Sequence, residues 1–276
     1  MKVFVINDDM KKAYTDMLPV FVREGADMFL GIQDETDPVG IAAIRAEGDT
    51  FVLEFIYILD EYRHRGAGTL LLDSVKNMLC MIGANRLETT YTLNDSTAVL
   101  HDFLEEMGLG EIEEENKPVM RFTLKDIPER FAGKNTEQVR SLKEVSESDW
   151  ACYMSEFAQF QEESNENVPD IGRRDLYDPD ISFVYMDEAH KIQGSIMFSR
   201  MDDELTIEHF ACLEKRNTKI VRSMIYAAVS MAKSTLSKEA AISFCAFDPG
   251  TLALADTISN GKMEQVGKSV TQIYYF

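Results

Sequence analysis

The chain has 276 residues, of which 45% are hydrophobic and 28% are charged, a composition typical of a globular protein with one large or two mid-sized domains. Its formal net charge of −20 disfavours nucleic acid and anionic lipid as partners. The sequence contains no apolar run of membrane-spanning length and no signal-peptide pattern at its start. We therefore expect a cytoplasmic protein with no nucleic-acid partner and no membrane partner.

The cysteines lie far apart in the sequence and match no metal-ligand spacing. Cys80, Cys152, Cys212 and Cys245 are expected to be core thiols in a reducing compartment. No metal site is predicted from them.

The first fifty residues contain three short apolar runs with strand character, and a helix follows the first of them. Asn7-Asp8-Asp9 is a helix N-cap signal, and this helix is predicted to continue to 18–22. Polar turns at 33–37 and 47–49 favour hairpins. The strands are predicted at 2–6, 28–32 and 40–45.

Residues 51–82 form the most informative stretch. Residues 51–59 are apolar with Glu54 as the only charge, which predicts a buried strand. Apolar residues then recur from Leu70 to Ile82 at steps of three and four, which predicts an amphipathic helix. Between them lies Arg63-His64-Arg65-Gly66-Ala67-Gly68. Glycines at a helix start allow close backbone approach, and the unpaired first-turn N–H groups with the helix dipole form a site for phosphate oxygens.

The glycine loop differs from two better-known phosphate loops. Leu71 stands where a dinucleotide-binding fingerprint has its third glycine, and no Gly-Lys-Ser/Thr sequence follows. Rossmann and P-loop chemistry are therefore not supported.

The remaining elements complete one domain and then begin a second. A strand at 86–91, a helix at 97–107 that stops at Gly108, and a strand at 119–124 end the first half. Residues 125–136 have the composition of a linker. The second half is predicted to contain strands at 142–145, 181–187, 192–201, 205–213, 241–246 and 269–276, helices at 146–160, 219–232 and 249–258, and a polar loop with a short helix at 161–180.

The second half repeats the first with an offset of 154 residues over about fifty positions. Gly40 corresponds to Gly194 and Glu54 to Glu208 in this alignment. Gly66 and Gly68, however, correspond to Ile220 and Arg222, and the loop at 215–219 has no glycine. We therefore predict a duplicated fold whose second copy has lost the phosphate loop.

The apolar strand, Arg63-x-x-Gly66-x-Gly68 and the leucine-rich helix resemble motif A of the GCN5-related N-acetyltransferases, the GNAT superfamily, over residues 40–109. The resemblance implies an α/β (α+β) protein with two tandem GNAT domains, each a mixed, mostly antiparallel sheet flanked by helices. Residues 1–126 would carry the intact acyl-CoA loop and 136–276 the degenerate one. It also implies transfer of an acetyl group from acetyl-CoA to a primary amine.

In this family, the fourth and fifth strands splay apart and the pantetheine of coenzyme A lies between them. The resemblance places the backbone of Ile56, Tyr57 and Ile58 at the pantetheine and thioester. Asn94 matches loosely an asparagine that often contacts the cofactor. The loop expected to hold the pyrophosphate consists of Arg63, His64, Arg65, Gly66, Ala67, Gly68 and Thr69.

Acetyl transfer needs a base to deprotonate the amine and a donor to the thioester oxygen. Glu54 is the candidate base, and the alternative is that it pairs with an arginine or with solvent. For the general acid, Leu104 occupies the position where the family often has a tyrosine. Tyr57 and Tyr91 are the substitutes considered, beside unassisted departure of the thiolate.

The sequence is also compatible with other functions, and it does not specify the acceptor or the oligomeric state. The chain could be a non-catalytic acyl-CoA sensor or scaffold, whereas Gly66 and Gly68 argue against a purely structural module. The acceptor is not specified, although the acidic charge favours a small cationic molecule. The oligomeric state is open, a homodimer included. His64 and His101 are not favoured as bases, and the acidic positions of 105–115 are expected to form mainly a solvated face.

Overall fold

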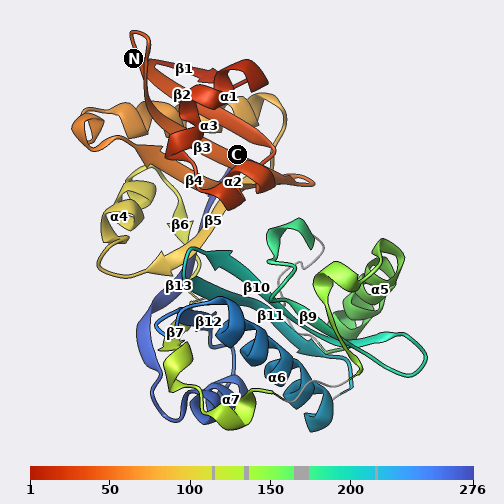
Figure 1. Ribbon diagram of the computed structural model, residues 1–276. Helices are drawn as coiled ribbons and strands as arrows, with labels where there is room; N and C mark the ends of the chain where they lie inside the picture. Colours follow the sequence, from red (N-terminus) through yellow and green to blue (C-terminus); the bar gives the residue numbers. More distant parts are fainter. Residues whose placement is uncertain (114–115, 134–136, 165–173, 215–216) are drawn as a thin grey trace. The chain divides into compact units, whose positions relative to one another are not determined.

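The computed structural model describes residues 1–113, 116–133, 137–164, 174–214 and 217–276, and the chain divides into two compact units (Figure 1). The first unit contains residues 1–117 together with 267–276, and the second contains 118–266. The sequence predicts domains at 1–126 and 136–276. Residues 118–126 therefore lie in the second unit and the C-terminal strand lies in the first, opposite to the predicted assignment.

The first unit is a mixed sheet with the strand order β1-β2-β3-β4-β5-β13, and β6 also pairs with β13. Only β4 and β5 run parallel; the other pairs are antiparallel. The strands are β1 (Lys2–Val5), β2 (Met28–Asp34), β3 (Asp37–Glu47), β4 (Thr50–Ile58), β5 (Arg86–Leu93), β6 (Gly110–Glu111) and β13 (Glu264–Tyr275).

Helices cover both faces of this sheet. α3 (Ala67–Met81) and α4 (Ala98–Glu106) pack with Ile32, Ile44 and Leu53 in one apolar cluster. α1 (Asp8–Tyr14) and α2 (Val20–Gly25) pack over the other face. The sequence predicts one helix here, but Pro19 is the N-cap of α2 and starts a second helix.

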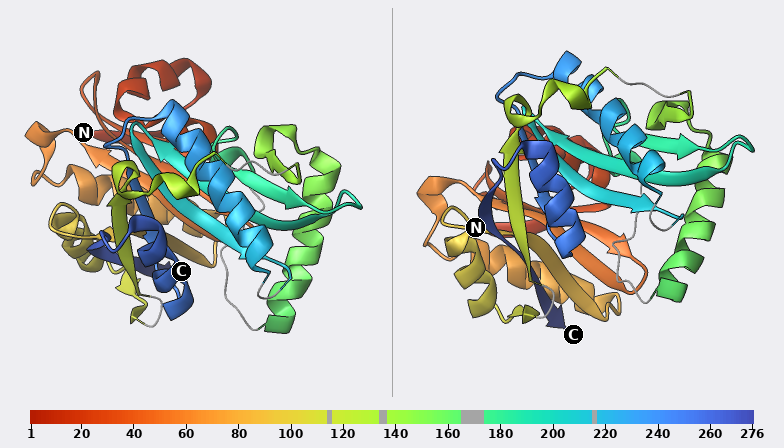
Figure 2. Two further views of the ribbon diagram at one scale, coloured as in Figure 1. Left: turned by 60° about the horizontal axis from the view of Figure 1, so that its bottom comes forward. Right: turned by 90° about the horizontal axis from the view of Figure 1, so that it is seen from below.

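The second unit has the strand order β7-β12-β11-β10-β9-β8, in which only β11 and β12 are parallel. The helix α6 (Thr218–Thr235) lies across these strands (Figure 2). On the opposite face, α5 (Glu147–Ser164) buries Trp150, Tyr153 and Phe157. The remaining elements are β7 (Lys117–Thr123), β8 (Val139–Ser141), β9 (Phe183–Met186), β10 (Ile192–Met201), β11 (Glu204–Cys212), β12 (Ala241–Cys245) and α7 (Pro249–Ser259).

The two sheets share an irregularity at the same place. In the first unit Ala43 pairs with Phe55 and Ile44 with Leu53, so the register skips Glu54. In the second unit the register between β10 and β11 skips Glu208 in the same way. A β-bulge is a specific backbone feature, and its recurrence 154 residues later supports the predicted duplication.

Each sheet receives its sixth strand from the other half of the chain. β13 pairs antiparallel with β5 from Arg86 to Leu93, and β7 pairs antiparallel with β12. β13 lies next to β5, which runs parallel to β4, and β7 lies next to β12, which runs parallel to β11. The two strands therefore hold equivalent positions in their sheets. The amphipathic pattern identifies both segments as strands but does not identify their partners.

Two smaller predictions need correction. The predicted linker at 125–136 does not form a free connection, because Ile127 is buried in the second unit's core and Phe131 packs against that core. Residues 134–136 lie outside the described residues. None of the four cysteines forms a disulfide, but Cys80 and Cys152 are exposed instead of buried. Within the described part of the chain, no helix is long and apolar enough to cross a membrane.

Candidate functional site

Strands β4 and β5 separate after a short parallel contact. Thr50, Phe51 and Val52 pair with residues 86–88, and the ladder then ends. Past Val52, the hydrogen bond from Thr89 Oγ1 to the Leu53 carbonyl, 2.9 Å long, connects the two strands. Beyond it, the edge of β4 that faces β5 has no ladder partner among the described residues, so 54–58 present backbone groups to an extended ligand.

The N-terminus of α3 follows directly from this strand edge. Gly66 is its N-cap, has a φ of 80°, and makes no side-chain capping bond. A Cβ at Gly66 would have no atom within 4 Å, so the space in front of the helix is open. The first-turn N–H groups therefore face this space with the positive end of the helix dipole, an arrangement suited to phosphate.

The matching helix of the second unit begins differently. The side chain of Asn217 accepts hydrogen bonds from the backbone N–H groups of Lys219 and Ile220. These donors are the ones that a phosphate would need, and an asparagine side chain already occupies them. Residues 215–216 of the glycine-free loop lie outside the described residues.

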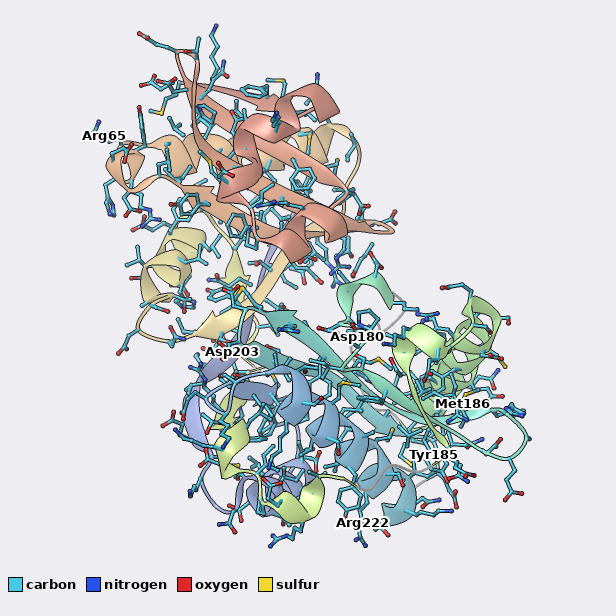
Figure 3. The ribbon with its side chains drawn as sticks, viewed as in Figure 1. Arg65, Asp180, Tyr185, Met186, Asp203 and Arg222 are labelled. Atoms are coloured by element: carbon cyan, nitrogen blue, oxygen red, sulfur yellow. The ribbon has the colours of Figure 1, made fainter. Side chains whose placement is uncertain are left out.

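The side chains of the α3 loop show how its basic residues are arranged. Arg63 donates from Nε to the Ile58 carbonyl at 2.9 Å and pairs with Asp60, also at 2.9 Å. Its guanidinium lies 5.5 Å from the centre of the Tyr57 ring. His64 has a φ of 58°, and Arg65 is exposed and points away from the surface (Figure 3).

The other residues of the predicted loop belong to the first turn of α3. Ala67 is buried, whereas Thr69 is exposed. A Cβ at Gly68 would lie 3.4 Å from Phe103 of α4, so this glycine also allows α3 to pass close to α4.

Glu54 is the residue that the bulge of β4 skips, and its carboxylate pairs with Arg45. The Arg45 Nε–Glu54 Oε1 distance is 2.5 Å, and the exposed fractions of the two side chains are 12% and 22%. Because Arg45 alternates with the inward-facing Ile44, it lies on the sheet face opposite α3. Regular alternation along β4 would place Glu54 on the side of Ile56 and Ile58, but the bulge breaks the alternation and Glu54 lies on the opposite face with Arg45.

A polar network connects α4 with β5, β6 and β13. The Tyr91 hydroxyl lies 2.9 Å from His101 Nδ1 and donates to Gln272 Oε1 at 2.8 Å. Burial, together with the negative charges of Glu111, Glu105 and Asp102, raises the pKa of Tyr91 to about 12. The sequence analysis missed this network, because Gln272 lies far from Tyr91 in the sequence.

Family comparison agrees with this geometry. Residues 4–109 match the family model described as Acetyltransferase (GNAT) family. The matched residues all lie in the first unit. The match covers the uncapped α3 and the separated strands β4 and β5. No curated protein matches the chain significantly in sequence.

Solved structures extend the similarity to the whole chain at the level of the fold. A tandem GNAT protein from the clavulanic acid biosynthesis pathway has a TM-score of 0.68 at 9% identity, covering 99% of this chain and 98% of that one. A GCN5-related N-acetyltransferase from Kribbella flavida has a TM-score of 0.55 at 16% identity, covering 99% and 72%. A glucosamine N-acetyltransferase region of a fungal β-N-acetylglucosaminidase has a TM-score of 0.62 at 12% identity, covering 99% and 38%. The chain thus has the tandem GNAT fold.

Leu104 departs from the GNAT pattern given in the sequence analysis, and Asn94 matches that pattern only loosely. Leu104, in place of the frequent tyrosine, is buried in the core of the first unit. The side-chain oxygen of Asn94 accepts bonds from the N–H and the hydroxyl of Ser96 and so builds the turn before α4. Neither residue supplies a proton donor to the gap between β4 and β5.

Proposed function

We propose that the chain is an acetyl-CoA-dependent N-acetyltransferase that acetylates the primary amine of a small cationic acceptor. The observation that carries the proposal is the contrast between two helix starts. Gly66 leaves the first turn of α3 uncapped, whereas Asn217 fills the first turn of α6. The single donor site therefore belongs to the first unit, and the second unit supports the fold without binding the donor.

In this proposal the diphosphate of acetyl-CoA lies at the first turn of α3. Backbone N–H groups of 67–69 donate to it, and Arg65 supplies positive charge from the loop. Arg63 acts indirectly, since its bonds to Ile58 and Asp60 hold the loop against the end of β4. The pantetheine arm follows the free edge of β4 along Ile56 and Tyr57.

Chemistry then takes place at the bulge of β4. A bulge leaves a backbone N–H outside the ladder, and such a donor stabilises the oxyanion formed from the thioester carbonyl. Glu54 is the proposed base that removes the proton from the attacking amine. The Tyr91 hydroxyl is bound to Gln272, and its raised pKa makes it a poor acid, so the thiolate leaves without its assistance.

The proposed acceptor class rests on charge. The net charge of −20 favours cationic ligands over anionic ones at long range. Glucosamine and polyamines belong to this class, and both should be included in the panel of amines.

Glycine substitutions test the donor site directly. In the double variant Gly66→Val/Gly68→Val, the side chain at 66 enters the open space in front of α3, and the side chain at 68 crowds the first turn against Phe103. The affinity for acetyl-CoA should therefore fall at least about tenfold. Gly83→Val is the matched control, because Gly83 has the same φ of 80° but lies beyond the other end of α3. Calorimetric titration of the full chain measures all three proteins. Equal affinities in the double variant and the control would reject the site.

One observation favours a second function, a non-catalytic acyl-CoA sensor or scaffold. The tyrosine that often serves as general acid is replaced by the buried Leu104. Release of free CoA thiol against the amine panel separates the two functions. The enzyme releases thiol with at least one amine, whereas the sensor binds acetyl-CoA and releases none.

A further inference from the structure

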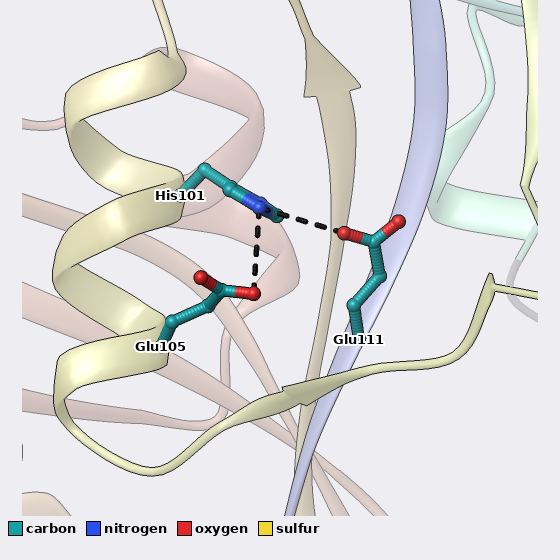
Figure 4. A group of neighbouring side chains, drawn as sticks. All are labelled: His101, Glu105 and Glu111. Carbon is teal, nitrogen blue, oxygen red and sulfur yellow. Dashed lines mark ion pairs between the residues drawn. The ribbon is translucent and has the colours of Figure 1, made fainter.

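The network on α4 contains a cluster of ligand-bearing side chains that acyl transfer does not use. His101 and Glu105 lie one turn apart on α4, and Glu111 lies on β6 (Figure 4). His101 Nε2 is 3.6 Å from a Glu105 oxygen and 3.4 Å from a Glu111 oxygen. One ligand atom from each residue falls within 4.8 Å of the other two.

The direction of the hydrogen bonds fixes which nitrogen of His101 carries a proton. Gln272 is fully buried, and its amide is oriented because Nε2 faces the His101 carbonyl at 3.5 Å. Tyr91 donates its only proton to Gln272 Oε1, so its oxygen accepts from His101 Nδ1. In the neutral ring, Nε2 then presents a lone pair to two carboxylates. This arrangement is repulsive unless a second ring proton or a metal cation lies between the ring and the carboxylates.

The Glu111 carboxylate is already held on one side. Its Oε1 accepts from Lys268 Nζ at 2.8 Å and from Asn116 Nδ2 at 2.6 Å, which leaves Oε2 for His101 and the cluster. The Glu111 side chain is only 13% exposed, so its carboxylate is held in a mostly buried position.

We propose that His101 Nε2, Glu105 and Glu111 bind one Zn²⁺ ion. Ligands about 2.1 Å from a tetrahedral zinc lie about 3.4 Å apart, close to the two distances observed. One imidazole and two carboxylates suit zinc better than Ca²⁺ or Mg²⁺, which prefer oxygen ligands alone. Tyr91 orients the imidazole through Nδ1, as outer-shell partners of zinc-bound histidines do.

The bound ion connects α4 to β6, and it acts on stability instead of acyl transfer. Lys268 and Gln272 hold the cluster from β13, so the ion also strengthens the attachment of the C-terminal strand to the first unit. Glu105 is 52% exposed and leaves the site open to solvent for metal entry.

The test uses the full chain without a purification tag, stripped of metal by a chelator and titrated with Zn²⁺ by calorimetry and with Co²⁺ by visible absorption. We expect one ion per chain and a higher melting temperature with Zn²⁺. Glu105→Gln should lower the Zn²⁺ affinity at least about tenfold. The control is Glu106→Gln, a change at the exposed neighbouring residue, which should leave the Zn²⁺ affinity equal to that of the unmodified chain.

Circular dichroism confirms that both variants keep the fold, so a loss of binding is not a loss of structure. A chain that takes up no Zn²⁺ or Co²⁺, with His101 carrying both ring protons, would overturn the proposal and identify an ion-pair cluster. Equal Zn²⁺ affinities for Glu105→Gln and Glu106→Gln would overturn it as well.

Discussion

Glu54 and Glu208 occupy the same bulge in the two sheets but have different partners. Glu54 pairs with Arg45, and Glu208 hydrogen-bonds the hydroxyl of Ser199, which is the repeat equivalent of Arg45. The two glutamates thus share a backbone environment, while only the first unit follows this strand with a helix that has no side-chain cap. This difference makes Glu208 a built-in control for the role of Glu54.

We expect Glu54→Gln to lower the acetylation rate by about a hundredfold or more, because a positioned base contributes at least that much. Its affinity for acetyl-CoA should stay the same, since the donor site lies on α3 and the β4 edge. Steady-state rates and calorimetry measure the two effects. Glu208→Gln should leave both unchanged; an equal loss of rate in the two variants would remove Glu54 from the mechanism.

His209 is a second residue whose repeat partner differs. It corresponds to Phe55, is 4% exposed, and packs edge-on against Phe157 with ring centres 5.0 Å apart. Its Nε2 is buried with no hydrogen-bond partner among the described residues. Burial lowers the pKa of His209 to about 4 from 6.5. The folded state therefore binds fewer protons than the unfolded state between these pH values.

Stability should accordingly fall as the pH drops through this window. At pH 4.5, His209 should cost about 2–3 kcal/mol of the free energy of unfolding relative to pH 7. His209→Phe removes this contribution and should be relatively more stable than the unmodified chain in acid. Urea unfolding at pH 4.5 and pH 7 measures the free energy of unfolding of both proteins. An identical pH dependence for both proteins would show that His209 does not titrate in this range.

At the level of elements, the sequence predicts most strands and helices because their apolar periods are strong. The phosphate loop was also predictable, since Gly66 and Gly68 are visible between a strand and a helix. The sheet face on which Glu54 lies could not be predicted, because the sequence of one strand does not show where a bulge interrupts the alternation of its side chains. The Tyr91–Gln272 contact joins residues 181 positions apart, and no local signal specifies it.

The exchange of β7 and β13 predicts how fragments behave. Residues 1–126 lack β13, and residues 136–276 lack β7. The first sheet therefore loses the partner of β5, and the second sheet loses the partner of β12. We expect each fragment alone to be largely unfolded, and a one-to-one mixture to regain native circular dichroism. A fragment 1–126 that folds alone and binds acetyl-CoA would contradict this prediction.

At the level of the whole molecule, duplication has produced two units with the same sheet order and the same bulge but different helix starts. The tandem fold is shared with solved GNAT structures at 9–16% identity, so packing has been kept while most side chains have changed. The sequence alone indicates the duplication and the lost second loop. The exchange of β7 and β13 could not be predicted from the sequence, because the apolar pattern of a strand is compatible with either sheet.

The number of acetyl-CoA molecules bound per full-length chain tests the central claim most directly. Calorimetric titration should give one molecule per unmodified chain and none for Gly66→Val/Gly68→Val, because of the two equivalent helices α3 has no side-chain cap whereas Asn217 caps α6. Two molecules per chain, or one that persists in the double variant, would contradict the account.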